Sequence, residues 1–322
     1  MAADVAPKPH RIDVHYHILP GRYASDERIR EHMRTQYVDP ATLGWTPQQA
    51  IEDMDRNGIE RGIGSIVVPG VWLGDVAHGR RIAREWNEDA ARIARDHPGR
   101  FGVFAPIPLP DTAGSLAEIA YALDVLQADG IGLMTSYDDR WLGDPSFAPV
   151  YEELNRRKAV VFVHPTVPVC CAGILPAVPS FIVEVPTDTT RAITSLLLTG
   201  TLARFPDIRF IFSHGGGTVT VLAARITGLT RMRKDLAERL PGGAEPELAK
   251  LYYDTAIAAN PVTMAALTKL APISHILFGS DYPFVPVAAT AMGLKGVGLA
   301  PADLAAIERG NAEALLAGGR GA

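Results

Sequence analysis

Short apolar runs that end on metal-binding or acid/base side chains are the feature that most constrains this chain. The first run ends in His15-Tyr16-His17. In a β-strand, residues i and i+2 point to the same face, so these two imidazoles can bind one metal ion. Three later runs end in the same way, on His164, His214 and Asp281. The carboxyl-terminal ends of parallel strands share one edge, so the four runs predict one site at one end of a parallel barrel.

Strand-like and helix-like segments alternate along the whole sequence. The expected strands lie near residues 11–15, 62–68, 101–107, 130–134, 160–164, 209–214, 251–255 and 275–279. The expected helices lie near residues 46–57, 78–97, 115–128, 146–157, 189–205, 219–240, 261–270 and 301–316. The strands are continuously apolar, as parallel strands covered on both faces should be. This order predicts an α/β fold, a (β/α)8 TIM barrel in one domain over residues 1–322, with the barrel at about residues 11–316.

Two of the strand-to-helix connections are long, namely residues 18–43 after the first strand and residues 165–188 after the fifth. Both leave the carboxyl-terminal rim, where the loops of a barrel form its site, so we expect them to cover a substrate pocket. Residues 241–247 are expected to form a surface loop, and residues 317–322 a frayed tail.

Composition excludes several classes of partner. The net charge of −5 gives no electrostatic argument for binding nucleic acid or an anionic membrane. The amino terminus lacks the apolar core of a signal peptide, and no apolar stretch approaches the ~18 residues of a membrane span. A cytoplasmic protein is therefore expected.

The two cysteines, Cys170 and Cys171, are neighbours in the sequence. A disulfide between adjacent residues is strained, so they predict no disulfide framework. We interpret them as buried or loop thiols rather than as metal ligands or nucleophiles, because no Cys-x-x-Cys spacing accompanies them.

The sequence resembles the amidohydrolase superfamily, and within it the branch of metal-dependent decarboxylases. That branch includes the aminocarboxymuconate semialdehyde, γ-resorcylate and 6-methylsalicylate decarboxylases. The resemblance covers nearly the whole chain. Its motifs are Ile12-Asp13-Val14-His15-Tyr16-His17, Val163-His164-Pro165, Asp188-Thr189-Thr190-Arg191-Ala192, Ser213-His214-Gly215-Gly216-Gly217 and Leu277-Phe278-Gly279-Ser280-Asp281-Tyr282-Pro283.

The resemblance implies a role for each of these residues. It makes His15, His17, His164 and Asp281 the ligands of one divalent metal ion, and His214 an acid/base that holds or deprotonates a bound water. Imidazoles with one carboxylate suit Zn²⁺, with Mn²⁺ as the alternative. A single ion also agrees with the residues themselves, because a second ion would need a bridging ligand, commonly a carboxylated lysine after the fourth strand. Residues 130–135 contain no lysine.

The first ligand differs within the branch. Some relatives that act on hydroxybenzoates have Glu where His15 stands, although His also occurs there, so this residue does not select the substrate. The opening from residue 11 to His17 looks most like the methylsalicylate-type members.

Contacts to a substrate are assigned only as candidates. An aromatic acid could stack on Phe181, Tyr282, Phe284 or Trp72, and each ring is equally plausible as part of the core. Arg191 could pair with a carboxylate, although its position also favours a salt bridge to Asp188. Three further side chains belong to the same question. Asp254 ends the seventh strand and could face the site, although a structural hydrogen bond is favoured. In this branch arginines of a neighbouring subunit can reach the site, and Arg225 or Arg231 could do so.

The combined prediction is a metal-dependent, non-oxidative decarboxylase of a small aromatic carboxylic acid, most simply an ortho-hydroxybenzoate such as a salicylate derivative. Either Asp281 or His214 would protonate the ring carbon, and the sequence does not choose between them. The alternative is a metal-dependent hydrolase of a lactone or cyclic amide with the same ligands. A structural metal site is disfavoured, since this site opens at the barrel mouth. The resemblance also implies a homodimer or higher homo-oligomer.

Overall fold

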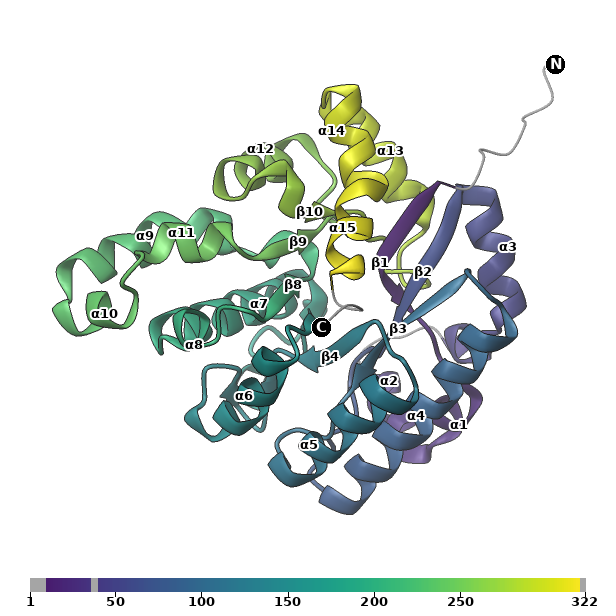
Figure 1. Cartoon of the computed structure of the whole chain (residues 1–322). Coiled ribbons are helices and arrows are strands. Elements are labelled where there is room, and N and C mark those ends of the chain that lie inside the picture. The colour runs from purple at the N-terminus through teal and green to yellow at the C-terminus, as the bar shows by residue number, and fades with distance from the viewer. Residues whose placement is uncertain (1–9, 36–39, 319–322) are drawn as a thin grey trace.

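Eight parallel strands form the centre of the molecule, with helices around them (Figure 1). The structure is a computed structural model that describes residues 10–35 and 40–318. The strands follow one another in sequence order around the sheet: β1 (Arg11–His17), β2 (Ile59–Ser65), β3 (Phe101–Pro106), β4 (Gly130–Met134), β7 (Val160–His164), β8 (Arg209–Phe212), β9 (Tyr252–Asp254) and β10 (Ile276–Leu277). The predicted (β/α)8 TIM barrel is confirmed.

The sheet closes between its first and last strands. The backbone N–H of Val14 donates to the carbonyl of Phe278 over 2.9 Å, and that of His17 to the carbonyl of Tyr282 over 2.8 Å. The residues after β10 therefore lie directly beside β1, although they are about 265 positions away in the sequence. This closure brings Asp281 next to His15 and His17.

The helices fall between the strands, as predicted. They are α1 (Gly21–Ser25), α2 (Glu27–Thr35), α3 (Pro47–Asn57), α4 (Val76–Asp96), α5 (Thr112–Ala120), α6 (Ala148–Arg156), α7 (Ser180–Leu198), α8 (Thr201–Arg204), α9 (Val219–Met232), α10 (Lys234–Arg239), α11 (Ala244–Ala249), α12 (Pro261–Leu270), α13 (Val287–Val297), α14 (Pro301–Ala305) and α15 (Asn311–Ala317). Sequence signals set several starts. Thr46 caps α3 by accepting from the N–H of Gln49 at 3.2 Å, with Pro47 in the first turn.

Side chains fill the inside of the barrel and leave only one end for a site. Ile12 and Val14 pack there against Phe162, which stacks on Phe104 with ring centroids 5.5 Å apart. Leu315 of α15 joins the same cluster, so the last helix covers the amino-terminal end of the strands. The barrel is a packed core rather than a pore, and chemistry is confined to the carboxyl-terminal end.

Several sequence-based boundaries were wrong. The second strand was expected at residues 62–68 but spans Ile59–Ser65, because Ile59 pairs with Arg11 and the Ile66–Val68 run continues past the strand into the core. The first long connection contains α1, α2 and a 3₁₀ turn (Pro40–Gly44), with residues 36–39 outside the described part. The expected loop at 241–247 includes the start of α11, and of the expected tail at 317–322 only Ala317 and Gly318 are described.

The helix after the fifth strand starts earlier than expected. The sequence predicted a start near Thr189. In the structure α7 begins at Ser180 and contains Pro186 in its interior. The second long connection is therefore shorter than predicted.

None of the described helices combines the length and the apolar character that a membrane span requires.

Candidate metal centre

An irregularity in β1 turns both histidines toward the inside of the barrel. Asp13 pairs with Gly62 and Tyr16 with Gly64, so three steps along β1 match two along β2. Val14 packs in the barrel interior, whereas Tyr16 packs in the outer layer between strands and helices. The extra residue is a β-bulge, and it lets His15 face inward directly after Val14. The ring of His15 contacts the interior ring of Phe162, with centroids 5.0 Å apart.

Asp13 holds this bulge. Its Oδ1 accepts the backbone N–H of His15 at 3.0 Å and that of Ser280 at 3.1 Å. One buried carboxylate oxygen thus fixes the backbone next to two predicted ligands, His15 and Asp281. Burial raises the pKa of Asp13 to about 7.

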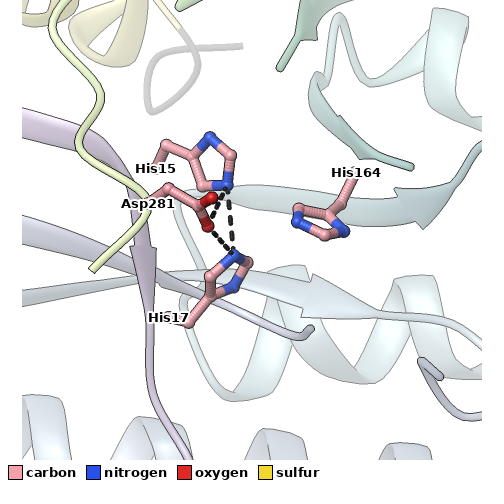
Figure 2. Close-up of side chains that lie close together, drawn as sticks. All are labelled: His15, His17, His164 and Asp281. Atoms are coloured by element: carbon pink, nitrogen blue, oxygen red, sulfur yellow. Dashed lines mark hydrogen bonds and ion pairs between the residues drawn. The ribbon is translucent and has the colours of Figure 1, made fainter. Parts of the chain in front are cut away.

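The structure brings the four predicted metal ligands together. Figure 2 shows His15, His17 and Asp281 on one side and His164 of β7 facing them. One donor atom from each of the four lies within 4.8 Å of the others, and all four residues are buried. Nε2 of His15 is 3.1 Å from Nε2 of His17 and 3.3 Å from Oδ1 of Asp281. Donor atoms bound to one ion at about 2.0–2.1 Å lie roughly 3 Å apart, so this spacing suits a shared cation.

Hydrogen bonds to the other ring nitrogens make the donor set fit a metal. Nδ1 of His15 lies 2.8 Å from the carboxylate of Asp254, Nδ1 of His17 lies 3.3 Å from the carbonyl of Ser65, and Nδ1 of His164 lies 2.9 Å from the carbonyl of Pro165. Carboxylates and carbonyls only accept, so Nδ1 of His15 and of His164 carries a proton, which leaves Nε2 of each ring to bind a metal ion. Nδ1 of His17 also lies 3.2 Å from Oγ of Ser65, a hydroxyl that can donate or accept. In the metal-free site a proton on Nε2 of His15 lies between the two Nε2 atoms, which are 3.1 Å apart, and a metal ion would take the place of that proton. The residues therefore fit one ion held by three imidazoles and one carboxylate.

The electrostatics of the metal-free site favour a cation. Burial lowers the pKa of His15, but the charges of Asp254 and Asp281 outweigh it and raise the pKa to about 10. Burial lowers the pKa of His17 and, helped by the other histidines, holds that of His164 well below its ordinary value. Burial would raise the pKa of Asp281, yet the charge of His15 and bonds from the histidines hold it well below its ordinary value. The same negative groups that attract a proton to His15 would attract a metal ion.

His214 stands at the edge of this cluster. Its Nε2 is 3.3 Å from Oδ2 of Asp281, while its Nδ1 is buried and has no hydrogen-bond partner among the described residues. His214 and Asp281 both have left-handed backbones, with φ of 54° and 69°. Such conformations are costly outside glycine and often occur at functional sites. The predicted acid/base pair is thus adjacent and conformationally constrained.

The end of β4 carries no lysine. Thr135 follows the strand, and its N–H donates to the carbonyl of His164 at 3.0 Å. The hydroxyl of Thr135 donates to Asp188 of α7, which also accepts from Trp141 Nε1 at 2.6 Å. Trp141 belongs to a short hairpin, β5 (Ser136–Tyr137) and β6 (Arg140–Trp141), that the sequence did not reveal. Asp188 therefore ties this hairpin and the end of β4 to α7.

The candidate substrate contacts separate into two groups. Phe284 lies at the cluster, with its ring centroid 5.5 Å from that of His17. Tyr282 stacks instead on Tyr16 at 4.5 Å, in the outer layer. Phe181, expected in a loop, stands on the first turn of α7 and is 59% exposed. Trp72 packs against the main core rather than lying free above the site.

Arg191 was expected at a helix start but lies in the middle of α7. Its Nη1 is 3.8 Å from Asp188, so the anticipated ion pair is present, and 3.9 Å from Glu184. The structure thus places Arg191 in a network on α7, and a contact between it and a substrate carboxylate stays a prediction.

Comparisons with known proteins show which family the chain is similar to. The family model described as amidohydrolase matches residues 12–317. The 6-methylsalicylic acid decarboxylase acuB of Aspergillus aculeatus is 41% identical over 288 residues, which cover 86% of this chain and 85% of that protein. Decarboxylase yanB of Aspergillus niger is 38% identical over 296 residues, covering 86% of this chain and 78% of the relative.

A solved structure has the same fold. The 5-carboxyvanillate decarboxylase of Novosphingobium aromaticivorans, crystallised with bound manganese, superposes with a TM-score of 0.82 at 18% identity, covering 95% of this chain and 97% of the other.

Proposed function

The chain belongs to the amidohydrolase family, and from this premise we propose that it is a metal-dependent decarboxylase of a small aromatic carboxylic acid. The observation that carries the proposal is the convergence of three imidazole nitrogens and Asp281, with His214 beside them, in a chain 41% identical to a 6-methylsalicylic acid decarboxylase. The favoured substrate class is an ortho-hydroxybenzoate.

The ligand set implies one metal ion held by His15, His17, His164 and Asp281. When bound, the ion supplies a Lewis acid that attracts the carboxylate and the ortho oxygen of the substrate. We propose zinc, because the set of three histidines and one carboxylate suits it, with manganese as the alternative. The manganese of the solved decarboxylase supports the alternative.

The protein's own groups would handle the proton. Decarboxylation needs one proton on the ring carbon that bears the carboxylate, followed by cleavage of the bond to CO₂, whose electron pair returns to the ring. His214 and Asp281 are the acid/base groups at the cluster, 3.3 Å apart, so either can deliver the proton and share it with the other. Phe284 lies beside His17 and would contact the ring of the substrate.

The testing experiment is release of CO₂ from a panel of ortho-hydroxybenzoates, including 6-methylsalicylate, by metal-loaded protein, with chelator-treated protein as the control. We expect metal-dependent release from at least one acid. Metal-loaded protein that releases no CO₂ but opens lactones or cyclic amides would contradict the proposal and favour hydrolysis.

Three variants test the assigned residues. His164→Ala should lose the metal and activity together, because it removes one of four ligands. His214→Ala should keep most of the metal and lose turnover by about 10²–10⁴-fold, the usual contribution of an acid/base group. Asp281→Asn should abolish turnover in either of its roles. Full metal occupancy in His164→Ala would contradict its assignment as a ligand.

We further propose a homo-oligomer in the cytoplasm. Leu229 and Met232 of α9 line one surface groove together with Leu198 of α7, and Met232 is 84% exposed. Exposed apolar patches often mark interfaces between proteins. Sedimentation at several protein concentrations tests the assembly, and fractionation of the source cells tests the location.

A further inference from the structure

Asp254 lies beside the four predicted metal ligands, and both of its carboxylate oxygens make hydrogen bonds. It is the last residue of β9 and is fully buried. Its Oδ2 is 2.8 Å from Nδ1 of His15. Its Oδ1 accepts the backbone N–H of His214 at 2.9 Å and that of Ala256 at 3.0 Å. One side chain thus contacts a predicted metal ligand with one oxygen and the predicted acid/base residue with the other.

The contact to His15 fixes which ring nitrogen faces the metal. Because Oδ2 of Asp254 accepts, Nδ1 of His15 always carries a proton, so Nε2 is the nitrogen left to bind the metal. That Nε2 is the atom 3.1 Å from His17 and 3.3 Å from Asp281. His15 is fully buried, so water has no access to replace Asp254 as the acceptor.

The contact to His214 stabilises a left-handed backbone conformation that is unfavourable for histidine. His214 has φ of 54°, and the three glycines that follow it have φ of 62°, 76° and 65°. Glycines adopt such angles freely, whereas histidine does so at a cost. A hydrogen bond from its own N–H to Asp254 opposes relaxation of this turn, and the turn places Nε2 of His214 3.3 Å from Asp281.

We propose that Asp254 is a positioning residue that links the metal ligand His15 to the acid/base residue His214. It acts through these two residues and touches no reacting atom. The proposal rests on the proposed function, because it assumes a metal at the cluster. It assigns a mechanistic role to a side chain for which the sequence favoured a structural hydrogen bond.

Asp254→Asn is the sharpest variant, because it changes one oxygen to NH₂ at nearly constant volume. If the NH₂ faces His15, the ring must accept at Nδ1 and carry its proton on Nε2, which then has no lone pair for the metal. If the NH₂ faces the other way, the backbone N–H groups of His214 and Ala256 lose their acceptor. Either arrangement disrupts one of the two links.

The matched control is Asp129→Asn. Asp129 is a buried carboxylate just before β4, at the opposite end of the barrel, and it too accepts from a backbone N–H, that of Val103 at 2.9 Å, and from a basic side chain, Arg61 at 2.7 Å. It therefore reproduces the general cost of removing a buried carboxylate without touching the cluster.

We expect Asp254→Asn to weaken the binding of Zn²⁺ or Mn²⁺, measured by chelator competition, by about 10- to 100-fold. At saturating metal we expect kcat for CO₂ release to fall by a similar factor with KM little changed, because His214 is misplaced while the substrate site persists. Asp129→Asn should change neither quantity. Unchanged metal affinity and kcat in Asp254→Asn would overturn the role of Asp254.

A second measurement does not depend on the variant folding. ¹⁵N NMR of the histidines in metal-loaded wild-type protein should show His15 protonated at Nδ1 and metal-bound at Nε2. A proton on Nε2 of His15 would overturn the proposal. Wild-type protein that binds no metal and releases no CO₂ would overturn the proposed function instead, so the two failures are distinguishable.

Discussion

At the scale of single residues, two buried carboxylates hold a predicted metal ligand in place through hydrogen bonds. Asp13 and Asp254 bind no metal themselves in this arrangement, yet each contacts His15, one through the backbone and the other through the ring. Each also contacts a second functional segment, Asp13 the N–H of Ser280 and Asp254 that of His214. The geometry of the ligands is thus set by one side chain on β1 itself and by one on β9.

The site should tolerate the loss of the negative charge of Asp13 but not the loss of its Oδ1 as a hydrogen-bond acceptor. Only its Oδ1 is used, while Oδ2 is buried with no hydrogen-bond partner among the described residues. Asp13→Asn should therefore keep the bulge and the metal. Asp13→Ala leaves the N–H groups of His15 and Ser280 without an acceptor, at a cost of about 1–3 kcal/mol each, and should lose metal. Metal content and urea unfolding of the two variants check this, and a metal-replete Ala variant would contradict it.

The pH dependence of stability should differ between wild type and Asp13→Asn. Burial raises the pKa of Asp13 from 3.8 to about 7 in the folded protein. A raised carboxyl pKa means that the folded state binds the proton more tightly, so the wild type loses stability as pH rises from about 4 to about 7. The Asn variant has no such loss. Its free energy of unfolding relative to wild type, measured in chelator, should increase between pH 5 and pH 8, and a constant difference would contradict the assignment.

At the scale of elements, the turn after β8 depends on contact with α7. Gly217 has φ of 65°, and a Cβ added there would collide with the carbonyl oxygen of Pro186. Thr190 on α7 also accepts the N–H of Thr218 at 2.8 Å. The turn that carries His214 therefore lies directly against the helix.

Gly217→Ala should push this turn away from α7. We expect kcat to fall at least about 10-fold while the metal stays bound, because His214 moves but the four ligands do not. Gly296→Ala is the control, since Gly296 lies in α13 with nothing near its Cβ position, and it should leave activity intact and slightly increase stability. Full activity in Gly217→Ala would show that the close approach is dispensable.

The order of strands and the residues at their ends were predictable from the sequence, because parallel strands are continuous apolar runs and end at one edge. The bulge in β1 was not, since Val14 and Tyr16 are both apolar and nothing local shows where the face changes. The start of α7 was also missed, because residues 165–188 were assigned to the connection and a proline in a helix interior, as Pro186 is here, is unfavourable. The acceptors of His15 and His214 lie about 240 and 40 residues away, a distance over which no local pattern operates.

At the scale of the whole molecule, the predicted ligands join distant parts of the chain. His15 and His17 come from the first strand, His164 from the middle, and Asp281 from the segment that closes the barrel. A bound ion would therefore cross-link the two ends of the sheet. We propose that the chain is one cooperative domain, so heating should give a single unfolding transition. Adding metal should raise its melting temperature, and the free energy of unfolding should increase by about 2.7 kcal/mol when the free metal concentration is 100 times the dissociation constant.

The size of this stabilisation should depend on pH. In the metal-free site the charges of Asp254 and Asp281 outweigh burial and raise the pKa of His15 to about 10, so metal must displace a proton from its Nε2. Proton competition weakens as pH rises, whereas Asp281 is ionised throughout, because its pKa is held well below its ordinary value. The metal-induced increase in melting temperature should therefore be larger at pH 8 than at pH 6. His164→Ala should show little increase at either pH, and equal increases in the wild type would mean that no proton leaves His15 when metal binds.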